Sequence, residues 1–254
     1  MKDKFSYFDM LAYFAPGFVL LWSAQQSLRF VGLSTYFQME NWAFESLVGL
    51  VLAYVLGQLV SARARMRFEA KAFRKWTPVF RDGLISENFL LRGRTVYGQA
   101  LCSEPRRVML IEMAMTHCEL SGQDAKKLDD WEGQLEAAQE VSHRIYRPLL
   151  TLLTDEEVGE KAITMSVRYV FFRNLNVAAA YGVLLFVLSA CYNLTINVPW
   201  TDAKIVLPTL LGLLFALTSL ASRRESLSSA INHVREVFDS AYHFYDSRSR
   251  AQRG

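Results

Sequence analysis

The feature that most constrains this chain is a long apolar run followed at once by a cluster of basic residues. The run extends from Phe44 to Val60, and its one charged residue, Glu45, stands at its start. An apolar segment of about 18 residues predicts a helix that crosses a lipid bilayer. Basic residues directly after a span indicate the side that stays in the cytoplasm. We therefore predict a membrane span over residues 44–62 and a cytoplasmic segment behind it.

Three further apolar runs predict three more spans, over residues 8–28, 175–194 and 205–221. Short connections would join the four spans into two helical hairpins. Of the 28 Lys and Arg residues, only Arg29 and Lys204 fall in the two outer connections, which leaves 26 on the inner side. This asymmetry predicts that both termini face the cytoplasm, and we expect a multi-pass protein of the bacterial inner membrane.

The predicted fold class is therefore all-α, a polytopic membrane protein with a helical cytoplasmic insert. Residues 1–62 form the first transmembrane hairpin, and residues 63–173 form the cytoplasmic insert. Residues 174–222 form the second hairpin. An amphipathic cytoplasmic helix and a tail follow over residues 223–254. A mean hydropathy of +0.11 fits such a division between membrane and cytoplasm.

Two amphipathic patterns organise the cytoplasmic part. Apolar residues recur at spacings of three and four from Leu128 to Leu152, which predicts one long helix whose start is marked by Gly122 and Asp124. In the tail, apolar residues between Leu227 and Tyr245 follow a short heptad-like pattern. This face either packs against the insert or associates with a second copy, and the pattern leaves both open.

Small residues repeat every four positions in two of the predicted spans. The second span carries Gly49, Ala53 and Gly57, and the fourth carries Gly212 and Ala216. Such stripes let another helix approach closely, because small side chains keep the backbones near each other. We predict helix contacts here, within one copy or between copies of an oligomer.

Charge is segregated within the insert. Residues 63–107 contain 11 basic and 4 acidic residues, a net charge of +7, and residues 108–160 contain 4 basic and 12 acidic residues, a net charge of −8. The basic half is expected to bind anionic lipid headgroups. Alternatives are a phosphate-bearing ligand such as a nucleotide, or the acidic half of another copy. The candidate anion-binding residues are Arg63, Arg65, Arg67, Arg74, Lys75, Arg92, Arg94, Arg106 and Arg107.

Motifs for catalysis are lacking. No Walker loop, Gly-x-Ser-x-Gly or His-Glu-x-x-His motif is present, so we predict no enzyme and no cofactor. His117 and Cys118 are adjacent and point to different faces of a helix, so we predict no metal site. His233 and His243 are expected at the surface of the tail. The spans have no charge at mid-membrane, which argues against ion-coupled transport and leaves a passive pore open.

Two short segments carry a resemblance to known proteins. They are Phe14-Ala-Pro16-Gly17-Phe18 in the first span, whose Pro16-Gly17 pair is a candidate hinge, and Tyr54-Val-Leu-Gly57-Gln-Leu in the second. Both resemble uncharacterised bacterial inner-membrane proteins, in which two helical hairpins flank a helical cytoplasmic insert. That layout is similar to the membrane effectors of anti-phage systems, which permeabilise or depolarise the membrane when a partner signals.

Two functions follow as hypotheses. The first is an oligomeric, channel-like membrane effector, with a role in anti-phage defence implied by the resemblance, that is triggered through its cytoplasmic region. The second is a membrane-anchored scaffold or regulator whose charged insert recruits a cytoplasmic protein. A membrane-embedded enzyme ranks behind both, because no pair of catalytic groups stands at a suitable spacing in the spans.

Overall fold

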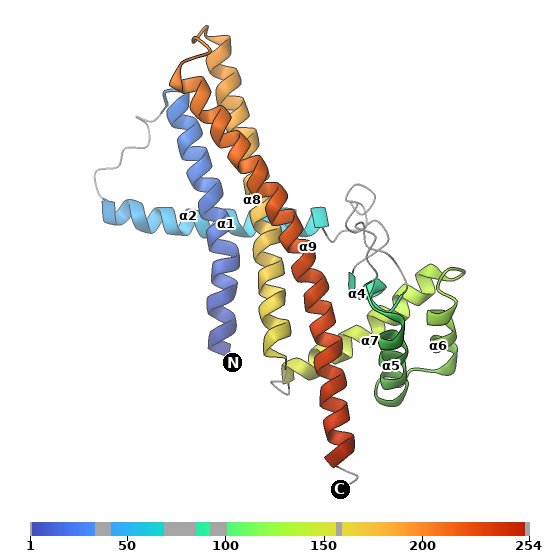
Figure 1. Ribbon diagram of the computed structural model, residues 1–254. Helices are drawn as coiled ribbons and strands as arrows, with labels where there is room; N and C mark the ends of the chain where they lie inside the picture. The colour runs from blue at the N-terminus through green and yellow to red at the C-terminus, as the bar shows by residue number, and fades with distance from the viewer. Residues whose placement is uncertain (1, 34–41, 69–84, 92–100, 156–158, 252–254) are drawn as a thin grey trace. The chain divides into compact units, whose positions relative to one another are not determined.

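The computed structural model describes residues 2–33, 42–68, 85–91, 101–155 and 159–251, and every regular element in these residues is an α-helix (Figure 1). The predicted all-α class is thereby confirmed. The helices are α1 (Lys2–Phe30), α2 (Trp42–Phe68), α4 (Ile85–Asn88), α5 (Glu104–His117), α6 (Gly122–Asp129), α7 (Leu135–Asp155), α8 (Glu160–Thr195) and α9 (Ala203–Ala251).

The chain divides into two compact units. Unit 1 comprises residues 1–66 and 167–226, and unit 2 comprises residues 67–166 and 227–254. Helices α8 and α9 contribute residues to both units. The predicted insert and tail therefore fold together as one unit, although about 60 residues of unit 1 separate them in the sequence.

Three helices are long and apolar enough to cross a membrane. They are Leu47–Phe68, Glu160–Thr195 and Ala203–Ala251; the first overlaps the predicted second span, and the other two contain the predicted third and fourth spans. The predicted first span forms α1, which is not among the three found in the residues that were searched. That α1 crosses a membrane stays a prediction.

Unit 1 has a bundle in which α1, α8 and α9 run alongside one another (Figure 1). Aromatic rings join the three helices. The ring of Trp22 in α1 stacks on Phe215 in α9, with centroids 6.0 Å apart, and meets Phe186 in α8 edge-on at 6.3 Å. Gly182 in α8 makes room for this cluster, because a Cβ there would overlap the Phe215 ring.

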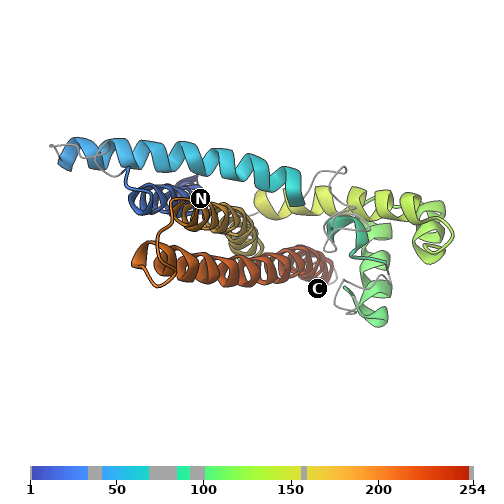
Figure 2. The same cartoon turned by 90° about the horizontal axis from the view of Figure 1, so that it is seen from above.

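Helix α2 crosses the bundle instead of running alongside α1 (Figures 1 and 2). The crossing is close, because a Cβ on Gly17 would overlap the carbonyl oxygen of Ala53, and a Cβ on Gly57 would overlap that of Tyr13. Residues 1–62 therefore contain two helices that cross here, and the transmembrane hairpin expected over these residues stays a prediction. Small residues at the contact let the two backbones touch at a steep crossing, a geometry that hydropathy does not report.

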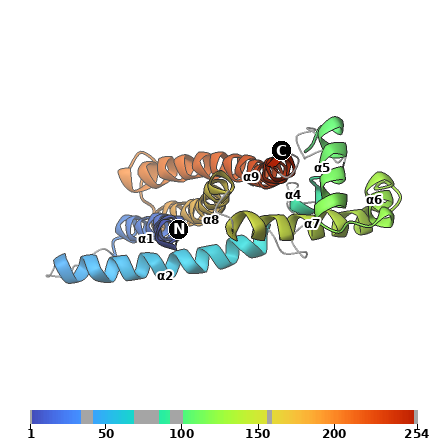
Figure 3. The ribbon, with the colours of Figure 1, turned by 90° about the horizontal axis from the view of Figure 1, so that it is seen from below.

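Unit 2 is a helical domain built around α7. Helices α4 and α6 pack against α7, and α5 contacts α6 (Figure 3). The end of α9 completes the core, where Phe238 stacks on Phe89 with ring centroids 4.9 Å apart. On the predicted tail face, Leu227, Val234 and Phe238 are buried. The structure therefore supports packing of the tail against the insert within one chain.

The predicted long amphipathic helix of the insert is divided in two. Helix α6 starts where predicted, because Ser121 and Asp124 form a reciprocal capping box, with the Asp124 backbone N–H donating to Ser121 Oγ at 3.1 Å. The helix then ends at Asp129, and turns extend to residue 134, where α7 follows. The turn residues Asp130 and Gly133 favour this break over continuation, because Asp and Gly are poor helix formers.

Candidate functional site

A buried arginine marks the most polar part of the unit 1 interior. Arg173 in α8 is 2% exposed. Its Nη2 donates to Ser61 Oγ of α2 at 3.5 Å, and its guanidinium lies 5.2 Å from the ring centroid of Tyr169. A cation over an aromatic face is stabilised by the ring quadrupole. In the sequence, Arg173 stands two residues before the predicted third span, whereas the structure buries it between helices.

Two asparagines extend this polar layer to the other helices. Asn174 is fully buried, and its Nδ2 donates to the Ala12 carbonyl of α1 at 3.1 Å. Asn176 Nδ2 donates to the Ser219 carbonyl of α9 at 2.6 Å and to Ser219 Oγ at 3.0 Å. Among the described residues, no partner faces the buried Oδ1 of Asn176. Residues 173–176 of α8 thus connect three neighbouring helices in one layer.

Sequence reasoning missed this layer. Its signal is the Arg-Asn-Leu-Asn sequence of residues 173–176, three polar side chains at the start of an otherwise apolar segment. Polar residues inside membrane bundles face the interior and form interhelical hydrogen bonds. The layer contains several hydrogen-bond donors and one acceptor, Asn176 Oδ1, that has no partner among the described residues. Such a set of groups is suited to positioning helices rather than to transferring protons.

A second set of hydrogen bonds ties α8 to its neighbours at the opposite end of the bundle. Asn193 Nδ2 donates to the Phe30 carbonyl of α1 at 3.2 Å and to the Lys204 carbonyl of α9 at 3.1 Å. Ser189 Oγ donates to the Ser27 carbonyl at 3.3 Å. The ends of α1 and α8 and the start of α9 are therefore held at the same level.

The predicted small-residue contacts fall into different surroundings. Ala53 is fully buried and Gly57 lies against Tyr13, both at the crossing of α1 and α2. Gly49, in contrast, faces open space. Gly212 packs against Phe186, where an added Cβ would lie 3.6 Å from the phenylalanine Cβ, and Ala216 is half-buried on the same helix. Two of the three glycines thus serve contacts within one chain.

The candidate hinge lies inside a continuous helix. Pro16 and Gly17 are both buried, and α1 runs through them from Lys2 to Phe30. Gly17 touches the α2 backbone, so close packing alone accounts for a residue without a side chain at this position. Movement at this pair stays a prediction.

The candidate anion-binding residues do not gather at one described site. Arg63, Arg65 and Arg67 are exposed on the last turns of α2. Arg106 forms an ion pair with Asp239 of α9 inside unit 2. The remaining candidates, Arg74, Lys75, Arg92 and Arg94, lie outside the described residues.

Arg107 has a structural position that does not fit anion binding at a surface. Its side chain is buried, and its Nε donates to the Leu90 carbonyl at 2.7 Å. Its Nη2 donates to the Leu128 carbonyl at 2.5 Å and to Asp129 Oδ1 at 3.0 Å. Arg107 therefore satisfies the Leu128 carbonyl in the last turn of α6, which lacks a helical partner, and the Leu90 carbonyl just after α4.

His233 and Tyr146 form a hydrogen-bonded pair in unit 2. His233 Nδ1 lies 2.7 Å from the Ala162 carbonyl, to which only a protonated nitrogen can donate. Tyr146 therefore donates its hydroxyl to the neutral Nε2 at 2.8 Å. Burial lowers the pKa of His233 and raises the pKa of Tyr146 to about 12. The prediction that His233 lies at the surface is wrong, because its ring reaches across to two other helices.

A metal site is not apparent in the described part of the chain. No group of three or more potential His, Cys, Asp or Glu ligands was found there. His117 instead stacks on Tyr245, with ring centroids 4.0 Å apart, and burial raises the pKa of the neighbouring Cys118 thiol. Both features belong to the packing of unit 2.

The chain matches no protein-family model, no curated protein and no solved structure.

Proposed function

We propose that the protein is an oligomeric, channel-like effector of the bacterial inner membrane, with unit 2 and both termini in the cytoplasm. One observation carries the proposal. Helix α2 is long and apolar enough to cross a membrane, yet it lies across the α1–α8–α9 bundle. In this proposal the structure is the resting state, and in the active state α2 spans the membrane and gives the protein four spans.

The surface of α2 supports this role. Large apolar side chains remain exposed along it, including Leu47 at 60%, Val51 at 56% and Leu59 at 62%. An exposed apolar face of this length requires lipid or protein to cover it. Hydrogen bonds of Asn174, Asn176 and Asn193 join α1, α8 and α9, and Arg173 joins α2 to α8. The exposed apolar face of α2 is then the surface that contacts a second copy in this proposal.

Flux from liposomes, together with the mass in nanodiscs, tests the proposal. Gly57→Val separates α2 from Tyr13 and should favour the active state, so its dye or ion release should exceed that of the natural protein. Gly49→Val is the matched control, since the added side chain enters open space. Release from a defined oligomer would support the effector. A monomeric mass with tight liposomes for both the natural protein and Gly57→Val would refute it.

Defence against phage is the biological setting that we propose for this effector, supported by the resemblance in layout. Plaque formation on cells with and without the gene tests it. A role in defence predicts fewer plaques when the intact protein is expressed, together with loss of membrane potential in infected cells. Equal plaque numbers across a broad phage panel would remove this setting while leaving the membrane activity to be judged by flux.

A membrane-anchored scaffold is the second candidate, favoured by the acidic surface of unit 2. Exposed carboxylates occur on α5, on α7 and in the turns between α6 and α7, including Glu112, Asp130, Glu132, Glu136 and Glu140. Such a surface attracts a basic partner. Neutralising the last three to glutamine should abolish recruitment of a cytoplasmic protein and leave membrane insertion intact. Unchanged recruitment would remove this candidate.

A further inference from the structure

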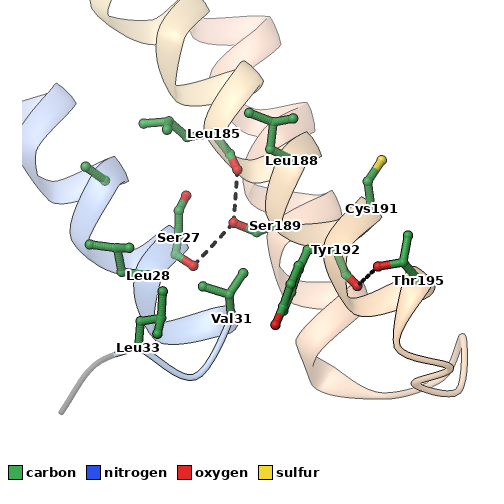
Figure 4. A pocket seen from close by; sticks show the side chains of 11 residues that line it. Ser27, Leu28, Val31, Leu33, Leu185, Leu188, Ser189, Cys191, Tyr192 and Thr195 are labelled. Atoms are coloured by element: carbon green, nitrogen blue, oxygen red, sulfur yellow. Dashed lines mark hydrogen bonds between the residues drawn. The ribbon is translucent and has the colours of Figure 1, made fainter. Parts of the chain in front are cut away.

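The turn between α8 and α9 exposes a tryptophan at one end of the unit 1 bundle. Trp200 is 74% exposed, the highest value among the exposed large apolar side chains of the described residues. Lys204 is exposed in the first turn of α9. On α8, Leu188 and Tyr192 are about half exposed along an apolar groove at the same end (Figure 4). Tryptophan and tyrosine at the end of an apolar helix are typical of a membrane–water interface, because their rings are amphipathic.

An exposed apolar face extends from this turn along α9. Seven of its large apolar side chains are 40–63% exposed, namely Val206, Leu207, Leu210, Leu213, Leu214, Leu217 and Leu220. No charged residue stands between Lys204 and Arg223 in the sequence. These two residues are 19 positions apart, which is about 28 Å along a helix. The apolar face therefore has the length of the hydrocarbon core of a bilayer, which is about 30 Å thick.

Basic residues mark the other end of this face. Arg223 and Arg224 follow it on α9. Arg168 of α8 forms an ion pair with Glu225 of α9 at 3.5 Å, so it lies at the same level, and its side chain is 53% exposed. Anionic lipid headgroups attract such basic residues, and long side chains at the ends of helices reach toward them. The apolar face thus has an aromatic end and a basic end.

The interior of unit 1 is arranged along the same length. Phe215, which stacks on the Trp22 ring, stands 11 residues after Lys204 and eight before Arg223, in the middle of the apolar length. The interhelical hydrogen bonds described above lie toward its ends. Ser219 accepts them four residues before Arg223, and the Lys204 carbonyl accepts another. An aromatic middle with such contacts toward both ends matches a bilayer, whose centre is the costliest place for polar side chains.

We propose that a lipid bilayer surrounds unit 1 in one defined register, with the Trp200 ring in the headgroup region of one leaflet and Arg223 in that of the other. A protein partner would require neither an apolar face of bilayer length nor aromatic and basic residues at its two ends, whereas lipid accounts for both. The inference rests on the membrane placement in the proposed function. It adds where the two surfaces of the bilayer lie on α8 and α9, and which ring anchors the turn between them.

Depth measurements on the full-length, fluorotryptophan-labelled protein test this register. The protein is placed in phosphatidylcholine–phosphatidylglycerol nanodiscs that carry a nitroxide either on the headgroup or at the end of an acyl chain. The fluorine NMR signal of Trp200, assigned by its loss in Trp200→Phe, should be broadened more by the headgroup label. Leu213→Trp adds a reporter nine residues after Lys204, about 13 Å along α9, and should be broadened more by the chain-end label. Leu220→Trp, three residues before Arg223, should again respond more to the headgroup label.

Both added tryptophans replace exposed side chains, and Leu214→Trp, at another exposed position, repeats the central measurement if Leu213→Trp fails to fold. A Trp200 signal that responds more to the chain-end label, or only to a soluble gadolinium chelate, overturns the proposal. An equal response of Leu213→Trp and Leu220→Trp to the chain-end label also overturns it. In these cases, broadening of Leu213→Trp by a lipid label retains the membrane placement. No response of any reporter to either lipid label refutes the membrane placement as well, whereas channel activity is judged by flux.

Discussion

Replacing Arg107 by methionine should loosen unit 2, because Arg107 satisfies two buried carbonyl groups. The side chain is 3% exposed and donates to the carbonyls of Leu90 and Leu128, two residues that are themselves fully buried. Leaving a buried acceptor unsatisfied costs about 1–3 kcal/mol, so the two carbonyls together account for about 2–6 kcal/mol. The ion pair with Asp129 adds at most about 1 kcal/mol, since that carboxylate is 70% exposed.

Native-state hydrogen exchange of the full chain measures this loss where it occurs. In Arg107→Met, the free energy of opening should fall for amides of α5 and α6. Arg144→Met is the control, because Arg144 is 60% exposed and its ion pair with Asp124 should contribute at most about 1 kcal/mol. Unchanged exchange in Arg107→Met, combined with weaker binding to phosphatidylglycerol liposomes, would refute the structural role and restore Arg107 as a surface anion ligand.

Three further perturbations test the packing, the titration and the polar layer. Gly182→Val should destabilise unit 1 by about 1–3 kcal/mol in thermal unfolding, because its side chain would overlap the Phe215 ring; a melting temperature equal to that of the natural protein would contradict the close packing. Burial lowers the pKa of His233 in the folded protein, so the unfolded chain takes up the proton first, and stability should fall as the pH drops below about 6.5. Urea unfolding between pH 7.5 and 5 measures this loss, and His233→Gln should reduce the slope; an equal slope would exclude His233 as its source. Asn174→Ala removes the hydrogen bond to the α1 backbone and should cost about 0.6 kcal/mol in unfolding from bicelles, a typical value for such bonds in membranes, whereas a gain in stability would argue against the bond.

Several features of the fold could be predicted because they depend on local sequence. The apolar segments of α2, α8 and α9 were found from hydropathy alone, since about 18 apolar residues suffice to define a candidate span. The start of α6 followed from its glycine and acidic residue, and the structure adds the Ser121 cap. Both signals are contained within a few turns of helix.

The candidate site was harder to predict, because its members come from distant segments. Arg173 stands just before a predicted span in the sequence, and its contact with Ser61, 112 residues away, depends on how α2 crosses the bundle. His233 was expected at the surface, because a tail sequence alone does not show that Tyr146 and the Ala162 carbonyl will surround its ring. Arg107 was grouped with surface cations for the same reason.

The sequence by itself determined that this protein is helical, which segments are apolar enough for a membrane, and where its positive charge lies. These properties depend on side-chain chemistry and on a helical period of 3.6 residues, and both are local. Only the tertiary structure decided that α2 crosses α1 at Gly57, and that the tail packs onto the insert through Phe238. The physical reason is that helix crossing and burial depend on the shapes of two surfaces at once, and each sequence segment specifies only its own.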